Sequence, residues 1–293
     1  MIKDKVSACI ITYNQENYIK DCLNGAINQV LDYDYEIVIG DDCSTDNTLK
    51  ICKEYAEQYP DKIKLLVRDK NKGMTGNWID TIQNCQGKYI ALCEGDDYWT
   101  DNYKLQKQVD FLEANPNYVI SFHKVHVLKP DGTVLEDLIT KVPENHETIE
   151  DMASFGNYIH TPSVVYRNII NEFPPEFNLS PICDYFLYMM LAQYGKVKYN
   201  QEAMGVYRSD VGVISKMSYI DVHYSEVRFY SCIASYLPDV KLKKIFIDRQ
   251  LPALKKMERV LNTNNKTYFI KDSKILKCAM YVSEKYKKLL KLF

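Results

Sequence analysis

The sequence predicts an α/β fold with a mostly parallel sheet flanked by helices, followed by a helical C-terminal extension. Two observations support this class. Four short apolar, β-prone runs alternate with three segments of helical pattern in the first hundred residues, which is typical of a parallel sheet with helices on both faces. After about Ser215 the pattern is helical only. We therefore expect one domain over residues 1–215 and a helical extension over residues 216–293.

The elements follow in a regular order. The apolar runs predict strands at residues 6–12, 36–40, 63–67 and 89–93. The helical patterns between them predict helices at residues 16–29, 45–58 and 75–85. Downstream, we expect a helix at 104–114, strands at 118–128 and 163–166, and a helix at 182–194 that begins after Ser180-Pro181.

The composition is that of an ordinary globular protein. Hydrophobic residues make up 46% of the 293 residues and charged residues 26%. The formal net charge is −2, whereas a general nucleic-acid binder would carry a strong basic excess. We therefore expect no nucleic-acid partner.

Nine cysteines are spread along the chain without any CxxC pair, which argues against a zinc site or a disulfide framework. Several lie inside apolar runs, so we expect buried free thiols in a reducing compartment. No apolar stretch is long enough for a signal peptide or a membrane span. These features predict a cytoplasmic protein.

Polar residues follow all four strands of the first hundred residues. They are Thr12-Tyr13-Asn14, Asp41-Asp42, residues 68–73 and residues 94–97. Ligands of open α/β sheets bind beyond the carboxyl ends of the strands, so we expect these segments to border one crevice. For Asp41-Asp42, capping of the next helix explains the sequence as well as ligand binding does.

Glu94, Asp96 and Asp97 place three carboxylates within four residues at a strand end. Such a cluster repels itself unless a cation neutralises it, and oxygen ligands suit Mg²⁺ or Mn²⁺. The chain has neither GxGxxG after its first strand nor GxxxxGK[ST], so a metal-bound diphosphate is the expected ligand. The alternative is a solvated loop or a helix cap.

Four sequence blocks carry a family resemblance: SACIITYN (7–14), EIVIGDDCSTDNT (36–48), NKGMTGN (71–77) and GKYIALCEGDDYW (87–99). In this order and spacing they resemble family-two glycosyltransferases, which have the GT-A fold, a Rossmann-like α/β sheet. The resemblance covers about two hundred residues. It implies inverting transfer of a sugar from a nucleotide-diphosphate donor, in particular a UDP-sugar, to an acceptor hydroxyl in surface polysaccharide or glycolipid synthesis.

The resemblance also implies roles for individual residues. Asp42 would bind the nucleotide base, and the metal ligands would be Asp96 and Asp97. Glu94 stands where the family's DxD motif often begins with aspartate, and this departure leaves open which carboxylate contacts the metal. The nucleotide-sugar site implied in this way consists of Thr12, Tyr13, Asn14, Asp42, Gly73, Asn77, Glu94, Asp96 and Arg208.

Inverting transfer requires a carboxylate that takes the proton of the acceptor hydroxyl. Asp184 lies in the first turn of the helix predicted at 182–194, where stabilisation of the helix dipole is an alternative reason for an acidic residue. The family places its base at the start of a helix in this part of the chain. The resemblance therefore implies that Asp184 is the general base.

The segment at residues 206–212 resembles a YRxH motif that lies near the diphosphate in many relatives, with Asp210 in place of the histidine. This substitution weakens the case for a third metal ligand. Arg208 either pairs with a phosphate or supports the loop, and the sequence leaves both alternatives open.

The last 28 residues, 266–293, contain eight lysines and two acidic residues, a local charge of +6. Apolar residues recur there at steps of three and four, which predicts a basic amphipathic helix. Such a helix can lie on an anionic membrane, where a lipid-linked acceptor would be found, and this would make the protein peripheral. It can equally dock on the catalytic domain or on a second subunit of a homo-oligomer.

Two rival functions share part of this pattern. A nucleotidylyltransferase also needs acidic metal ligands, but it would have a glycine-rich loop after its first strand, which this chain lacks. A catalytically silent module that binds a sugar nucleotide or a glycan would keep the pocket and lose the base. The carboxylates and Asp184 favour the enzyme, with a nucleotide-sugar donor, a glycan or lipid-linked acceptor, and Mg²⁺ or Mn²⁺ as cofactor.

Overall fold

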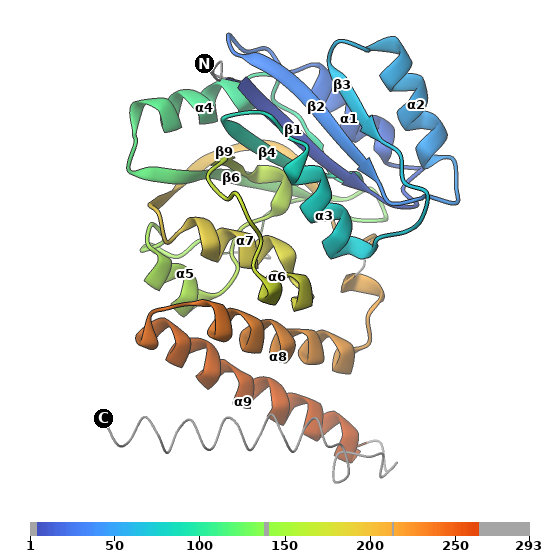
Figure 1. The fold of residues 1–293 in the computed structure, drawn as a ribbon. Coiled ribbons are helices and arrows are strands. Elements are labelled where there is room, and N and C mark those ends of the chain that lie inside the picture. The colour runs from blue at the N-terminus through green and yellow to red at the C-terminus, as the bar shows by residue number, and fades with distance from the viewer. Residues whose placement is uncertain (1–4, 138–140, 213, 264–293) are drawn as a thin grey trace. The chain divides into compact units, whose positions relative to one another are not determined.

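The computed structural model describes residues 5–137, 141–212 and 214–263 (Figure 1). They form two compact units. The first contains the described residues up to Phe173 together with Cys183–Ser215, and the second contains Pro174–Ile182 and the described residues from Lys216 onward. Residues 174–182 thus group with the later helices, although they lie within the expected first domain. The division into a catalytic domain and an extension stays a prediction.

The first unit is built on one sheet of nine strands in the order β3-β2-β1-β4-β8-β6-β9-β5, with β7 paired to β6 (Figure 1). Four neighbouring strands run parallel: β3 (Ile63–Leu66), β2 (Asp34–Asp41), β1 (Lys5–Thr12) and β4 (Tyr89–Glu94). The other strands are β5 (Tyr98–Trp99), β6 (Tyr118–Leu128), β7 (Val134–Glu136), β8 (Val165–Arg167) and β9 (Lys196–Arg208). Strands β6 and β9 also pair in parallel, whereas β5, β7 and β8 join the sheet by short antiparallel pairings. The sheet is therefore mixed, and its long pairings are parallel, as predicted for those of β1 with β2 and β4.

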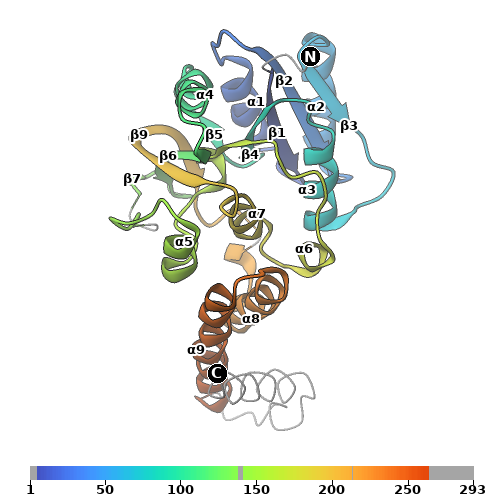
Figure 2. The same cartoon turned by 60° about the vertical axis from the view of Figure 1, so that its left-hand side comes forward.

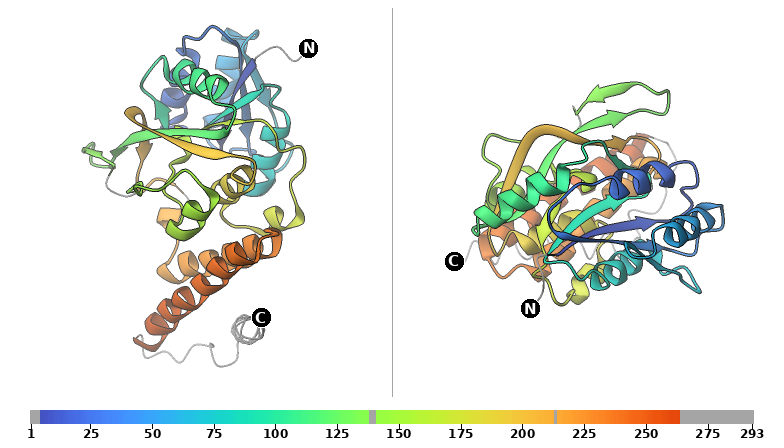
Figure 3. Two further views of the ribbon diagram at one scale, coloured as in Figure 1. Left: turned by 90° about the vertical axis from the view of Figure 1, so that its left-hand side faces the viewer. Right: turned by 90° about the horizontal axis from the view of Figure 1, so that it is seen from above.

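Helices cover both faces of this sheet (Figures 2 and 3). One face packs against α1 (Ile19–Ile27), α2 (Thr48–Gln58) and α4 (Lys104–Ala114), and their apolar residues share a core with those of β1, β2 and β4. The other face packs against α3 (Gly73–Gln83) and α7 (Cys183–Leu191). At Gly40 of β2 an added Cβ would overlap the side chain of Thr81, so the absence of a side chain allows α3 to approach the strand.

Most predicted elements are present, but their ends differ and some were missed. The first helix begins at Ile19 and the helix predicted at 182–194 is α7, which ends at Leu191. Strands β5, β7 and β9 and helices α5 (Ile149–Phe155) and α6 (Pro175–Leu179) were not predicted from the sequence, although α5 begins with a capping box of Thr148 and Asp151. The long strand β9 matters most, because it carries Arg208 into the site described below.

The second unit is helical in the part that the structure describes. It contains α6 (Pro175–Leu179), α8 (Tyr219–Tyr236) and α9 (Val240–Thr263), and the short turn η2 (Ile214–Lys216) precedes α8 in the chain. Among the described helices of both units, none is long and apolar enough to cross a membrane. The basic helix expected over residues 266–293 lies outside the described residues.

Lys104, the first residue of α4, is fully buried, although lysine is almost never buried without a partner. Its ammonium nitrogen lies 4.3 Å from the centroid of the Trp99 ring and has no hydrogen-bond partner. Burial lowers the pKa of Lys104 to about 7. In the unfolded chain the pKa returns to its ordinary value, so the buried lysine opposes folding most strongly where it is charged, below about pH 7.

We expect Lys104→Met to stabilise the protein by about 1–3 kcal/mol at pH 6, because it removes a buried charge and keeps the volume of the side chain. The gain should shrink between pH 7 and pH 10, where the folded wild type holds Lys104 neutral. Urea unfolding at pH 6 and pH 9 measures this difference. Lys107→Met is the matched control, since Lys107 lies on the same helix but is 43% exposed and pairs with Asp101 and Glu202. Equal gains in the two variants would contradict the prediction.

Candidate active site

The pairing of the parallel strands brings their carboxyl ends to one edge of the sheet. Thr12 at the end of β1 pairs with Asp41 at the end of β2, and Ile11 pairs with Glu94 at the end of β4. Beyond these ends, Asn14 and Cys43 adopt left-handed backbone conformations with φ of 53° and 63°. Such conformations are rare outside glycine and concentrate at functional sites.

Asp41 and Asp42 have different neighbours. Both carboxylate oxygens of Asp41 accept hydrogen bonds from Ser44, one from the backbone and one from the hydroxyl. Asp42 instead accepts the backbone N–H of Lys72 at 2.7 Å, and its own carbonyl accepts the side-chain amide of Asn71. At the start of α2 it is Asp46 whose carboxylate accepts the N–H of Thr48. Helix capping therefore does not account for Asp42, and its contact with a base stays a prediction.

The other residues of the implied donor site differ in exposure. Thr12 is buried and donates to Gln15, whereas Tyr13 is 46% exposed. Gly73 opens α3 with φ of 75°, a left-handed conformation that favours glycine. Asn77 is buried under the sheet and its side-chain amide donates to the carbonyl of Gly40 at 2.8 Å. The structure thus gives Asn77 a role in packing α3 against β2.

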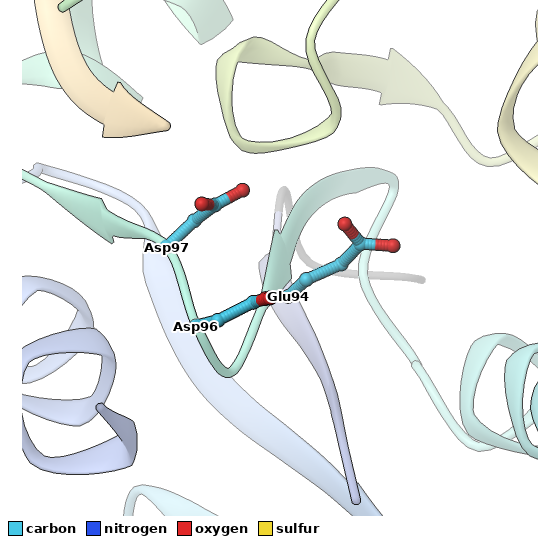
Figure 4. A group of neighbouring side chains, drawn as sticks. All are labelled: Glu94, Asp96 and Asp97. Atoms are coloured by element: carbon cyan, nitrogen blue, oxygen red, sulfur yellow. The ribbon is translucent and has the colours of Figure 1, made fainter. Parts of the chain in front are cut away.

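Glu94, Asp96 and Asp97 form a compact acidic cluster around the turn after β4 (Figure 4). One carboxylate oxygen from each lies within 4.8 Å of the others. Asp96 and Asp97 are only 7% and 1% exposed, which argues against a solvated loop. One oxygen of Asp97 accepts the N–H of Arg208 at 2.8 Å, while the other is buried without a hydrogen-bond partner.

Burial and mutual repulsion shape the electrostatics of this cluster. Burial raises the pKa of Glu94 to about 8, with further contributions from the charges of Asp96 and Asp184. The pKa of Asp97 is also raised well above its usual value, chiefly by burial and then by Asp96 and Glu94. A divalent cation would relieve this repulsion and give the free oxygen of Asp97 a partner. Asp210 is exposed, adopts φ of 64° and is not part of the cluster.

Arg208, at the end of β9, holds the acidic turn in place. Its guanidinium donates to the backbone carbonyl of Asp96 at 2.6 Å and pairs with Asp21 of α1. The group also lies 5.1 Å and 4.7 Å from the ring centroids of Tyr18 and Tyr98. Because these contacts engage the buried guanidinium, the structure favours loop support over a direct phosphate contact.

Asp184 lies in the first turn of α7, and the side-chain amide of Asn157 donates to its carboxylate at 2.9 Å. Burial raises the pKa of Asp184. The charge of Asp184 contributes, after burial and Asp96, to the raised pKa of Glu94. Burial raises the pKa of Tyr207 of β9, and so do the charges of the cluster and of Asp184. Asn157 was not predicted from the sequence because it belongs to no motif, and Tyr207 entered only as the tyrosine of the YRxH-like segment.

The family model that describes glycosyl transferase family 2 matches residues 7–173, more than half of the chain. The chain belongs to glycosyl transferase family 2. The family predicted from the four sequence blocks is therefore confirmed. The match includes the acidic cluster and ends before Asp184 and Arg208.

Curated relatives of this family 2 chain include an uncharacterized protein of Mycobacterium tuberculosis. It is 37% identical over 216 residues, which cover 74% of this chain and 62% of the relative. Bacillus subtilis TuaG, named as a candidate glycosyltransferase of teichuronic acid biosynthesis, is 31% identical over 137 residues, or 47% of this chain and 53% of TuaG. The chain thus spans less than two thirds of the length of these relatives.

Solved structures share the fold of this family 2 chain at low sequence identity. Staphylococcus aureus TarS 1–349 in complex with UDP-GlcNAc has a TM-score of 0.62 at 18% identity, covering 94% of this chain and 79% of TarS. The mannosyltransferase PcManGT of Pyrobaculum calidifontis, in complex with GDP-Man and Mn²⁺, has a TM-score of 0.61 at 15% identity, covering 96% of this chain and 80% of PcManGT. The predicted GT-A fold is confirmed.

The two roles left open for Arg208 are separated by Arg208→Lys. This variant keeps the positive charge but loses the planar fork that reaches both Asp96 and Asp21. If Arg208 supports the loop, we expect a loss of roughly 1–3 kcal/mol in the free energy of unfolding, measured in urea. Unchanged stability together with weaker binding of UDP would instead indicate a phosphate contact.

Proposed function

We propose that this chain is a metal-dependent inverting glycosyltransferase. It transfers a sugar from a nucleotide-diphosphate donor, in particular a UDP-sugar, to an acceptor hydroxyl of a surface polysaccharide or glycolipid at the cytoplasmic side of the membrane. The observation that carries this proposal is the cluster of three carboxylates, Glu94, Asp96 and Asp97, at the end of β4 in a chain of glycosyl transferase family 2. The donor named for TarS and the pathway named for TuaG support the choice of substrates.

The ends of β1 and β2 supply the nucleotide half of the proposed site. Asp42 is 3% exposed, and its carboxylate is held by the backbone of Lys72. A carboxylate fixed in this way can accept hydrogen bonds from a nucleotide base or a ribose. Tyr13 follows Thr12, whose carbonyl accepts the N–H of Asp42, and its half-exposed ring would provide an apolar surface for the base.

The acidic cluster suits Mg²⁺ or Mn²⁺, because its donors are carboxylate oxygens and the second oxygen of Asp97 has no other partner. Asp96 and Asp97 would hold the ion, with Glu94 beside them. When bound, such an ion neutralises charge that develops on a departing diphosphate. The complex of PcManGT with GDP-Man and Mn²⁺ supports this assignment.

Asp184 would act as the general base. The acceptor oxygen attacks the anomeric carbon, its proton passes to the carboxylate of Asp184, and the bond from the anomeric carbon to the diphosphate oxygen breaks. The raised pKa of Asp184 makes its carboxylate a better proton acceptor than an ordinary aspartate. Asn157 fixes the orientation of the group through its hydrogen bond to one carboxylate oxygen.

Asp184→Asn should reduce transfer by about 10²- to 10⁴-fold, because the amide cannot take the proton. Binding of the donor should remain near wild type. The measurement is release of UDP or GDP from UDP-GlcNAc, other UDP-sugars and GDP-mannose in the presence of Mn²⁺, with binding followed by calorimetry. Asp110→Asn, at an exposed carboxylate on α4, is the control. Wild-type turnover by Asp184→Asn would exclude Asp184 as the base.

Asp97→Asn should abolish the enhancement of UDP binding by Mn²⁺ while the fold is retained. The reason is that asparagine keeps the oxygen that accepts the N–H of Arg208 but replaces the free carboxylate oxygen with an amide. Calorimetric titration of UDP with Mn²⁺ and with EDTA measures the effect. Equal enhancement in the variant and in the wild type would place the ion elsewhere. Donor binding without any turnover by the wild-type protein would indicate a binding module.

A further inference from the structure

Phe155, at the C-terminal end of α5, is an exposed aromatic residue that the proposed mechanism does not use. Of the phenylalanines that the structure describes, it alone is exposed, at 60%. A single exposed apolar side chain is common on protein surfaces and by itself indicates nothing. Phe155 differs from the others in its position relative to Asp184.

Two hydrogen bonds hold the end of α5 against the start of α7, which lies beside it (Figures 1 and 2). The hydroxyl of Tyr185, the residue after Asp184, donates to the carbonyl of Met152 at 2.7 Å. The same carbonyl accepts the N–H of Gly156 at 3.0 Å, which closes the last turn of α5. Asn157 then donates its side-chain amide to the carboxylate of Asp184 at 2.9 Å. The chain on both sides of Gly156 is thus fixed next to the first turn of α7.

Gly156 and Asn157 are held in the conformation that makes this contact. Gly156 has φ of 100° and ψ of −170°, a backbone conformation that essentially only glycine adopts. The N–H of Ile159 donates to the side-chain oxygen of Asn157 at 3.1 Å, so the amide nitrogen of Asn157 faces Asp184. One N–H of this exposed amide donates to Asp184, and no described residue accepts the other. The second N–H is therefore available to a ligand.

The role of Asp184 as a base limits where an acceptor can lie. The acceptor hydroxyl must come within about 3 Å of the carboxylate to lose its proton. Consecutive Cα atoms are ~3.8 Å apart, so the Cα atoms of Phe155 and Asn157 lie within about 7.6 Å of each other. Phe155 also follows Met152, whose carbonyl contacts α7, by one helical turn, so the two residues share a face of α5. A sugar whose hydroxyl meets Asp184 is therefore within reach of both the Asn157 amide and the Phe155 ring.

We propose that Phe155 and Asn157 form an acceptor subsite that takes a pyranose ring. The ring of Phe155 packs on the apolar face of the sugar, and the second N–H of Asn157 donates to one of its oxygen atoms. The inference rests on the proposed function, in which Asp184 accepts the proton of an acceptor hydroxyl. It adds the chemical class of the acceptor, since an open-chain polyol has no flat face to match an aromatic ring.

The test is an NMR titration of the protein in the presence of Mn²⁺ and either UDP or GDP. The probes are the methyl β-pyranosides of glucose, galactose, mannose and N-acetylglucosamine, with ribitol as the open-chain comparison. The signals followed are the Phe155 ring and the Asn157 side-chain amide, which are assigned by their loss in Phe155→Leu and Asn157→Asp. We expect at least one pyranoside to shift both signals, and ribitol to shift neither.

Phe155→Leu should weaken the binding of that pyranoside by roughly three- to tenfold, because leucine keeps an apolar side chain but lacks the flat ring. Phe155→Tyr keeps the ring and should bind as the wild type does. Tyr194→Leu is the matched control, since Tyr194 is 64% exposed but lies beyond the opposite end of α7 from Asp184. This control variant should bind the pyranoside with wild-type affinity.

Equal affinities of the wild type and Phe155→Leu would overturn the inference. A titration in which no pyranoside shifts either signal, or in which ribitol shifts them more than any pyranoside does, would also overturn it. These outcomes are distinguishable from failure of the proposed function, because the titration needs no turnover. Wild-type turnover by Asp184→Asn would refute the proposed base and leave the measured pyranoside affinities as they are.

Discussion

The parallel pairing of β1 with β2 and β4 is the constraint on which the site depends. It places Thr12, Asp41 and Glu94 at one edge of the sheet with a register set by backbone hydrogen bonds. A slip of one residue would turn every side chain of a strand to the opposite face. The alternating core contacts of these strands with α1, α2 and α4 oppose such a slip, so the same packing that stabilises the fold also fixes the polar ends.

The acidic cluster at this edge concentrates negative charge, which is unfavourable, and hydrogen bonds from Arg208 fix the turn that carries it. Arg208 donates from its backbone to Asp97 and from its side chain to the carbonyl of Asp96. Its contacts with Asp21 and with two tyrosine rings connect the acidic turn to α1 and β5. Arg208 therefore anchors the turn, yet one oxygen of Asp97 has no hydrogen-bond partner, which agrees with the proposal that a cation binds there.

The sequence predicted the parts of the fold that depend on local pattern. Helix α4 and strand β6 have the expected bounds, and the four parallel strands lie where the apolar runs indicated. Strand β9 was not predicted, because three consecutive polar residues at 200–202 interrupt its alternation of polar and apolar side chains. Its pairing with β6 also contains shifts in register. The contacts of the site residues were not predicted either, since they join residues far apart in the sequence. Arg208 and Asp21 are separated by 187 positions, and Asn157 and Asp184 by 27. Contacts of this kind depend on tertiary structure, and one sequence contains no signal for them.

Among the residues that the structure describes, three outside glycine are left-handed: Asn14, Cys43 and Asp210, which follow the ends of β1, β2 and β9. Asparagine and aspartate tolerate this backbone conformation better than most residues, whereas cysteine does not share that tolerance. Any replacement at these positions must therefore tolerate the left-handed backbone before it can alter the chemistry of the proposed site. The repertoire of side chains open to evolution is therefore narrowest just after the strand ends, and new specificities would have to arise in the longer segments around them.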